Sequence, residues 1–248
     1  MKLAIIADIH GNALALEAVL ADIKRHQVDD ILNLGDHLSG PLEAKRTADI
    51  LINSHMISIS GNHDRTMVDL TFDEMGKSDQ AAYRQLDATH VNWLRELKDT
   101  HLYNDEIFMC HGSPKSNLDM WMEQIMPNGA FALASQNQIE NYAIGINHPI
   151  ILCGHTHIPR IVRLSGGRIL INPGSVGFPA FGEKEPVDFY MQNGIPDACY
   201  VILEKISNQW MPSFHYVPYD SLAAAEMAKI AGFDDWVSGL TTGWYQKH

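Results

Sequence analysis

Cysteine, basic residues and long apolar runs are all scarce in this sequence of 248 residues. The three cysteines are an odd number without a Cys-x-x-Cys spacing. This argues against a disulfide framework and favours a reducing compartment, so we expect a cytoplasmic protein. No stretch approaches the roughly 20 apolar residues of a membrane span. The apolar run at residues 3–7 stops at an acidic residue and is too short for a signal peptide, so it predicts a buried strand.

Positive charge is also in short supply. Lys and Arg number 18 against 30 Asp and Glu, which gives a formal charge of −12. Such a surface repels nucleic-acid backbone and anionic membranes, so we expect neither as a partner. An anionic substrate would be repelled as well, unless a local cation overrides the field of the whole chain. The composition is that of a globular protein, and we expect one domain spanning residues 1–248.

The sequence does contain a recurrent pattern, in which a short apolar run is followed at once by polar residues that can bind metal. The pattern occurs at residues 3–7, 31–34, 56–60, 107–110 and 150–153. Runs of this length, rich in Ile and bounded by Gly, predict buried strands. Between the first three runs, apolar stripes predict helices at residues 12–25 and 43–52. Alternating strands and helices indicate an α/β sheet, which binds ligands beyond the carboxyl ends of its strands.

The pattern changes after residue 157. Apolar runs at 161–164 and 168–171 flank a Ser-Gly-Gly turn and predict a hairpin. The runs at 199–204 and 211–217 predict a second hairpin. An Ala-rich helix is predicted at 221–231, and the remainder is expected to be a short tail.

Two segments fit no core element. We expect residues 118–147 to be helical and residues 178–196 to form a long loop. Because long loops in compact domains are often functional, both segments are candidate insertions that wall the substrate site. Their aromatic and Met side chains suit stacking on a flat apolar group, and the alternative is that they only close the core. These side chains are Trp121, Met122, Met126, Phe131, Phe178, Phe181, Phe189 and Tyr190.

The polar residues that follow the five predicted strands are candidate metal ligands. Asp8 and His10 are separated by one residue, as are His155 and His157, so in an extended chain each pair points to one side. Carboxylate and amide oxygens with imidazole nitrogens, and no thiolate, suit divalent Mn, Fe, Zn or Ni. Seven candidates exceed what one ion takes from protein, which favours two ions sharing one carboxylate. The candidates are Asp8, His10, Asp36, Asn62, His111, His155 and His157.

In order and spacing, these motifs resemble the calcineurin-like metallophosphoesterases. The resemblance rests on Asp8-x-His10, Gly35-Asp36, Gly61-Asn62-His63-Asp64, a lone His111 and Gly154-His155-Thr156-His157. The Asn-Pro-Gly-Ser-Val-Gly segment at 172–177 extends it to a subgroup of small bacterial and archaeal members. It implies a four-layer αββα sandwich, in which two mixed sheets are flanked by helices. It also implies ligand roles: a first ion on Asp8, His10 and His157, a second on Asn62, His111 and His155, and Asp36 bridging the two.

The activity that the resemblance implies is hydrolysis of a phosphoester by two metal ions, as a phosphodiesterase or a small-molecule phosphatase. A hydroxide bridging the metals would attack phosphorus in line. Two divalent ions, two carboxylates and one hydroxide leave about +1, which would let an acidic chain bind phosphate. His63 is the candidate catalytic residue, as proton donor or phosphoryl contact. In the protein phosphatase branch an aspartate orients this histidine, but Ser39 stands at that position, so the partner of His63 is not identified.

Two other functions compete with this one. Some relatives are interaction modules that have lost catalytic residues, whereas here the ligand set and His63 are complete. Others are nucleases, which the acidic balance disfavours. We therefore expect a small phosphoester substrate, including nucleotide-like esters. Among the neighbouring residues, we expect Asp64 to orient the site, Arg65 either to reach a phosphate or to form a surface ion pair, and Cys110 and Cys153 to be inert buried thiols.

Overall fold

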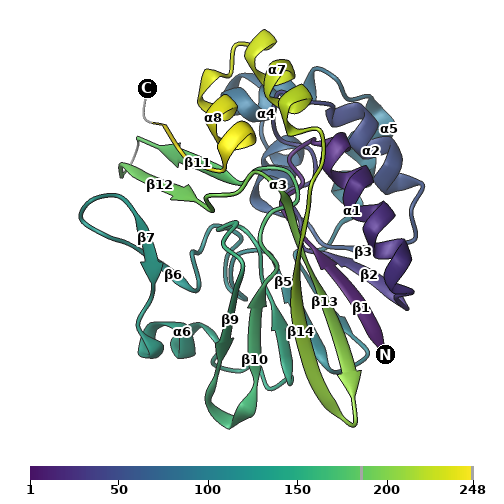
Figure 1. Ribbon diagram of the computed structural model, residues 1–248, viewed down its shortest axis with the longest axis vertical. Coiled ribbons are helices and arrows are strands. Elements are labelled where there is room, and N and C mark those ends of the chain that lie inside the picture. The colour runs from purple at the N-terminus through teal and green to yellow at the C-terminus, as the bar shows by residue number, and fades with distance from the viewer. Residues whose placement is uncertain (185–186, 247–248) are drawn as a thin grey trace.

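Two five-stranded mixed sheets form the centre of the computed structural model, which describes residues 1–184 and 187–246 (Figure 1). In the first sheet the three strands β1 to β3 are parallel, β13 is antiparallel to β1, and β14 pairs antiparallel with β13 at the edge of the sheet. Its order is β14 (Gln209–Val217), β13 (Ala198–Ile206), β1 (Lys2–Ile6), β2 (Asp30–Asn33) and β3 (Ile57–Ser58).

The second sheet has three parallel strands at its centre and one antiparallel strand at each edge. Its order is β4 (Thr100–Tyr103), β5 (Ile107–Cys110), β8 (Ile150–Leu152), β10 (Ile169–Asn172) and β9 (Arg160–Arg163). The carboxyl ends of the parallel strands carry the five polar motifs of the sequence.

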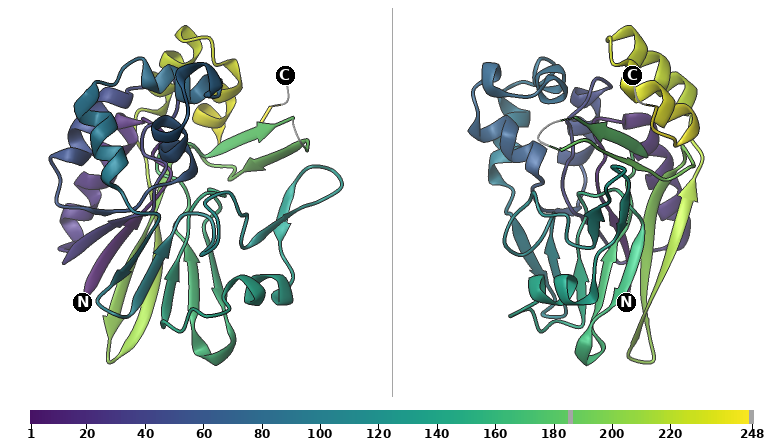
Figure 2. Two further views of the ribbon diagram at one scale, coloured as in Figure 1. Left: turned by 180° about the vertical axis from the view of Figure 1, so that it is seen from behind. Right: turned by 90° about the vertical axis from the view of Figure 1, so that its left-hand side faces the viewer.

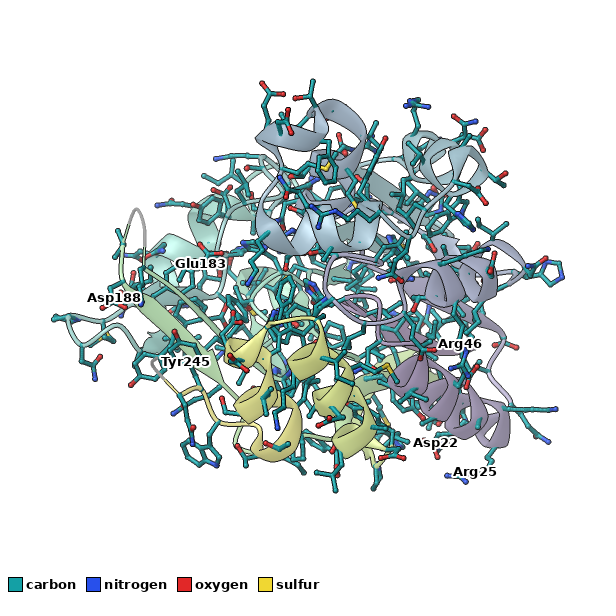
Figure 3. The ribbon with its side chains drawn as sticks, turned by 90° about the horizontal axis from the view of Figure 1, so that it is seen from above. Asp22, Arg25, Arg46, Glu183, Asp188 and Tyr245 are labelled. Carbon is teal, nitrogen blue, oxygen red and sulfur yellow. The ribbon has the colours of Figure 1, made fainter. Side chains whose placement is uncertain are left out.

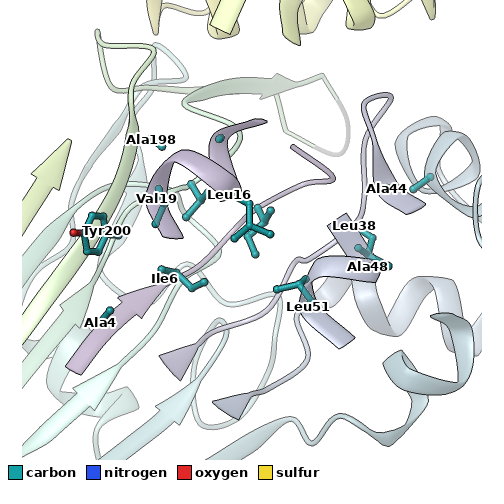
Figure 4. Packing of buried hydrophobic residues seen from close by; sticks show 14 of the residues in the cluster. Ala4, Ile6, Leu16, Val19, Leu38, Ala44, Ala48, Leu51, Ala198 and Tyr200 are labelled. Carbon is teal, nitrogen blue, oxygen red and sulfur yellow. The ribbon is translucent and has the colours of Figure 1, made fainter. Parts of the chain in front are cut away.

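The core between the sheets follows from the alternation of side chains along each strand. In β1, Leu3 and Ile5 pack against the second sheet, whereas Ala4 and Ile6 pack against the helices, and all four are fully buried. Figure 4 shows the helix side of this strand, where Leu16 of the first helix meets the sheet. A strand buried on both faces explains why its sequence is a continuous apolar run.

Helices cover the outer face of the first sheet (Figure 2). The first of them begins where the Asn12 side chain accepts a hydrogen bond from the backbone N–H of Ala15, which caps the helix. The five helices of this layer are α1 (Ala13–His26), α2 (Ala44–Ile52), α3 (Asn62–Asp69), α4 (Lys77–Tyr83) and α5 (Ala88–Glu96).

The outer face of the second sheet carries the fourth layer, which consists of α6 (Gln136–Tyr142) and the segment before it. Trp121 and Ile139 are buried there against Ile151 and Leu170 of the sheet. The architecture is therefore the four-layer αββα sandwich that the family resemblance implied. None of the helices within the described ranges is long and apolar enough to cross a membrane.

Three expectations were wrong. Residues 118–147 are not mainly helical, because β6 (Glu123–Ile125) and β7 (Phe131–Leu133) form a ribbon before α6. Residues 178–196 form a second ribbon of β11 (Ala180–Glu183) and β12 (Phe189–Gln192), with residues 185–186 outside the described ranges. The end of the chain is not a tail, since α8 (Asp234–Thr242) packs on α7 (Ser221–Ile230) through Trp236 and Leu240.

Candidate metal centre

All seven predicted ligands come together beyond the carboxyl ends of the parallel strands. Asp8 and His10 follow β1, Asp36 follows β2, and Asn62 begins α3 after β3. The three other histidines follow β5 and β8 of the second sheet, so both sheets contribute to the cluster. The donor atoms form two groups, each with its atoms within 4.8 Å of one another: Asp8, His10 and His157 in the first, and Asp36, His111 and His155 in the second.

The backbone at these residues is unusual. Five of the seven candidates adopt the left-handed conformation, which side chains other than Gly rarely enter. Each such residue costs about 1–3 kcal/mol and persists only where its surroundings impose it. The pairs after β1 and β8 therefore reach the centre through two tight turns, and not through the extended chain that we expected from their spacing. The five residues are Asp8, His10, Asp36, His155 and His157, with φ of 54°, 50°, 54°, 67° and 58°.

Three of the histidines are oriented by backbone carbonyls. In His10, His111 and His157 the Nδ1–H donates to a carbonyl oxygen, so Nε2 is the nitrogen that faces the centre. A metal-binding histidine is fixed in this way, because the outer hydrogen bond sets both the tautomer and the direction of the ring. The acceptors are the carbonyls of Ser39, Leu34 and Phe178, at 3.2, 2.8 and 2.7 Å.

The first group brings together atoms that need a cation between them. His10 Nε2 lies 3.1 Å from His157 Nε2. Burial, and after it the neighbouring His157, hold the pKa of His10 well below its usual value, so His10 is neutral and its Nε2 has a lone pair. Asp8 Oδ1 lies 3.4 Å from His157 Nε2, and the other oxygen, Oδ2, is buried without a hydrogen-bond partner among the described residues. An unpaired buried carboxylate oxygen is costly, and a metal ion would satisfy it.

In the second group, His111 and Asp36 form a buried pair. His111 Nε2 lies 3.1 Å from Asp36 Oδ2. Burial alone would lower the pKa of His111, but Asp36 outweighs it and raises the pKa to about 9. Burial, and then the charge of His111, lower the pKa of His155 to about 3. The same Oδ2 of Asp36 lies 4.0 Å from His10 Nε2 of the first group, so this carboxylate stands between the two groups.

Asn62 completes the second group. Its Oδ1 lies 3.0 Å from His111 Nε2. This end of the amide also faces two acceptors, Asp36 Oδ2 at 3.3 Å and His155 Nδ1 at 2.9 Å. Without a cation the amide would turn its NH₂ towards these acceptors, whereas a metal ion would favour the oxygen. Metal–ligand distances of about 2.0–2.2 Å require donor atoms roughly 3–4 Å apart, and these separations fit that requirement.

Asp64 holds the loop that carries Asp36, as expected of an orienting residue. Its carboxylate is fully buried and accepts hydrogen bonds from the backbone N–H of Asp36 at 2.9 Å and of Gly61 at 2.8 Å. It also pairs with the Nδ1 of His37 at 2.7 Å. A Cβ at Gly61 would overlap the Asp36 carboxylate, so the approach of these two loops requires glycine.

His63 has the partner that the sequence did not reveal. Its Nδ1 lies 2.8 Å from Asp79 Oδ1, on α4, and its backbone N–H donates to Asp36 Oδ1 at 2.9 Å. Burial opposes the charged form, but Asp36 and the hydrogen bond to Asp79 outweigh it and raise the pKa of His63 to about 10. Asp79 lies sixteen residues after His63 in a helix that we did not predict, and no motif marked it.

For Arg65 and the two cysteines near the centre, the structure favours a structural role over a functional one. Arg65 pairs with Asp99 at 2.8 Å and with the carbonyl of Leu97, so it is held at the surface and not at the centre. Cys110 and Cys153 are buried, and burial raises the pKa of both thiols well above the usual value, which makes them inert.

A cavity of about 650 Å³ opens from the two ligand groups. The cavity is lined by residues of the two segments that fitted no predicted core element, 118–147 and 178–196. Residues at the start of α4 and residues of α8 line it as well. Trp121 and Met122 do not, because they are buried in the core of the outer layer. From the two segments, the lining residues are Leu118, Met120, Ile125, Phe131, Phe178, Phe181, Gly182, Glu183, Val187 and Phe189.

Two packed mixed sheets with candidate Asp, Asn and His metal ligands at their strand ends are typical of a metallophosphoesterase. Residues 1–191 match the family model of the calcineurin-like phosphoesterase superfamily domain, so the chain belongs to this family. Over 98% of its length it is similar to the crystal structure of a metallophosphoesterase from Sphaerobacter thermophilus, with 26% identity, 99% of that chain covered and a TM-score of 0.74.

Two further relatives carry no assigned activity. A hypothetical protein from Pyrococcus horikoshii OT3 has the same fold, with a TM-score of 0.74, 18% identity and 99% of both chains covered. An uncharacterized protein of Methanocaldococcus jannaschii is 26% identical over 209 residues, which covers 73% of this chain and 78% of that protein.

Proposed function

We propose that the protein is a two-metal phosphoester hydrolase, a phosphodiesterase or a small-molecule phosphatase. The observation that carries this proposal is the pair of adjacent ligand groups with Asp36 between them, at the floor of a cavity large enough for a substrate. Family membership supports phosphoester hydrolysis in general. The chemistry of the donor atoms supports the two-metal form.

The donor set fits two divalent ions such as Mn, Fe, Zn or Ni, because it combines carboxylate, amide and imidazole donors. When bound, these ions would supply Lewis acidity for the phosphoryl oxygens and lower the pKa of a water molecule. Asp36 would be shared. Asp8, His10 and His157 would hold the first ion, and Asn62, His111 and His155 the second.

His63 is the proposed catalytic residue of the chain itself. Because Asp79 accepts the Nδ1–H, the tautomer is fixed and Nε2 is left for the substrate. The protonated ring can donate to the leaving oxygen or to a phosphoryl oxygen. A neighbouring cation lowers the pKa of a histidine, so bound metal ions would bring the pKa of His63 down from about 10 towards the range where it can release its proton.

The proposed substrate is a small phosphoester, including nucleotide-like esters, and not a nucleic acid. The positive metal centre would attract a phosphate to a chain whose overall charge of −12 repels long polyanions. The three cysteines are free thiols in the described structure, which supports a reducing compartment such as the cytoplasm as the place of action.

The test is an assay after metal removal and reconstitution. Bis-p-nitrophenyl phosphate and p-nitrophenyl phosphate are compared with Mn²⁺, Zn²⁺, Fe²⁺ and Ni²⁺ in turn. We expect hydrolysis that depends on metal, and a loss of roughly 10²-fold or more in Asp36→Asn. The matched control is Asp73→Asn, which changes an exposed carboxylate outside the centre. Tight metal binding without hydrolysis of either ester would favour a non-catalytic interaction module instead.

A further inference from the structure

The cavity continues from the metal centre along a row of aromatic rings. The ring centroids of His157 and Phe181 are 4.8 Å apart, and those of Phe181 and Phe189 are 6.1 Å apart. Phe189 in turn stacks on Phe131 of the other ribbon at 5.3 Å. The row therefore begins at a candidate ligand and ends on β7, and every phenylalanine in it lines the cavity.

The two ribbons that carry these rings are joined. The backbone N–H of Tyr190 in β12 donates to the carbonyl of Gly129 at 2.9 Å, and Ala130 forms a β-bridge with the same residue. The β6–β7 and β11–β12 ribbons therefore form one continuous wall, and the positions of its rings do not depend on a bound ligand. Figure 1 shows the β11–β12 ribbon beyond the upper ends of the sheets, with the β6–β7 ribbon below it and beside the second sheet.

Several apolar side chains of this wall are exposed to solvent. Phe131 and Phe181 are only partly buried, and two apolar side chains on the cavity, Leu118 and Val187, are 68% and 52% exposed. Phe178 and Phe189 are different, because they are only 8% and 7% exposed, and Phe178 also stacks on Trp236 at 3.7 Å. Side chains that only close a core are covered as Phe178 is, whereas an apolar surface left open beside polar groups marks a ligand site.

Positive charge is almost absent from the same wall. Lys77 is the only Lys or Arg among the described residues that line the cavity. Its Nζ donates to the carbonyl of Gly232 at 2.9 Å and lies 4.4 Å above the Phe233 ring, so it is already engaged. Glu183 and Asp235 add negative charge to the lining, and Figure 3 shows Glu183 on the same side of the molecule as Tyr245.

This distribution of charge limits the number of phosphate groups that the substrate can carry. Each further phosphate of a polyphosphate carries negative charge and is normally met by Arg, Lys or a metal ion. Here the metal centre can neutralise one phosphate, and the wall beyond it offers carboxylates. A leaving group without charge would meet apolar rings instead, in a cavity whose volume is typical for a drug-sized ligand.

We propose that the aromatic wall binds the leaving group, and that the substrate is a phosphoester with a single phosphate whose leaving group is uncharged and carries a flat ring. The proposal rests on the hydrolase function above. Phe181 and Phe131 would pack against the ring, while the buried Phe189, which contacts both, would hold them in place. Glu183 and Asp235 would disfavour a leaving group that bears a second phosphate.

The first arm of the test varies ring size. We compare kcat/KM for 2-naphthyl phosphate and phenyl phosphate, whose leaving groups are both unactivated phenols. The wild type should prefer the larger ring, and Phe131→Leu should reduce that preference roughly 5- to 10-fold, because an aliphatic side chain cannot stack. Phe72→Leu is the matched control, since Phe72 lies outside the cavity and its loss should leave the preference unchanged. Melting temperatures of both variants separate stacking from loss of fold.

The second arm varies charge. The wild type should hydrolyse AMP, which releases uncharged adenosine, at least 10-fold more efficiently than ADP, which would release charged AMP. Glu183→Lys should narrow this gap several-fold by giving the wall a cation.

The outcomes separate the two proposals. If no ester is hydrolysed with any metal, the hydrolase function itself fails. If all esters are hydrolysed with equal efficiency, and Phe131→Leu behaves as Phe72→Leu does, the hydrolase function stands and the aromatic leaving-group site is wrong. Efficient use of ADP by the wild type would overturn the single-phosphate restriction.

Discussion

Binding of the second metal ion should displace a proton from His111. The Nε2 of His111 lies 3.1 Å from Asp36 Oδ2, and this carboxylate raises the pKa of His111 to about 9. Below that pH the ring is a cation and Nε2 carries a proton, so it cannot bind a metal. Two other candidate histidine ligands, His10 and His155, have lowered pKa values, so their rings are neutral at pH 7.

The size of the effect follows from the difference between the pKa and the working pH. Two pH units separate pH 7 from the pKa of about 9, so proton competition at pH 7 should weaken binding of this ion about 100-fold relative to a fully deprotonated His111, and about 50-fold relative to pH 9. The affinity should rise about tenfold for each pH unit below pH 9 and level off above it. Metal affinity must rise with pH, because a raised histidine pKa keeps the ring protonated at low pH and a protonated Nε2 cannot bind a metal.

Two measurements test this prediction. Side-chain NMR after metal removal should show two histidines that titrate above pH 8, His63 near pH 10 and His111 near pH 9. The titration near pH 9 should be missing in His111→Gln and retained in the control His101→Gln, which changes a half-buried residue of the edge strand β4. Competition with a metal chelator should then give the slope of affinity against pH. A His111 that titrates near the usual value of about 6.5, with a flat affinity between pH 7 and 9, would falsify the pairing with Asp36 on which the reasoning depends.

Three further predictions concern the same centre. Elemental analysis after reconstitution should approach two transition ions per chain, and a plateau at one would contradict the two groups of donors. His63→Ala should keep both ions but lower kcat roughly 10²–10⁴-fold on an alkyl ester, and an equal loss on a p-nitrophenyl ester would indicate a phosphoryl contact instead of proton donation. Asp79→Asn should lower kcat more than it changes KM and should shift the pH profile, with partial rescue in Asp79→Glu; an unchanged pH profile would mean that Asp79 only supports the fold.

The convergence of the candidate metal ligands could be predicted from sequence because each of them follows a strong local signal. The runs that end before Asp8, Asp36 and His111 are Ile-rich and apolar on both faces, so their nature and their ends could be placed within a residue. What the sequence did not predict was the backbone that delivers the ligands. The positive φ at both members of each i, i+2 pair is imposed by surrounding loops, such as the one that Asp64 holds.

The ribbons were missed for a different physical reason. Strands of three or four residues gain little from local preference, and their stability comes from pairing and packing. β7 is placed by Phe131 against Phe189, and Gly129 by its hydrogen bond to Tyr190, about sixty residues away. A single sequence contains no local trace of such contacts, so the pattern was equally compatible with helix or loop.

The same limit explains why Asp79 was not found, and it shows how the site is built. Ser39 occupies the position from which an aspartate was expected to orient His63, but here its carbonyl orients His10 instead. The carboxylate for His63 comes from α4, and the start of this helix, at Lys77, also lines the cavity. One short helix therefore contributes both to the proposed catalytic residue His63 and to the lining of the cavity. A change in α4 that alters leaving-group binding will move Asp79 as well, so kcat and KM are expected to change together there, whereas they can separate on the ribbons.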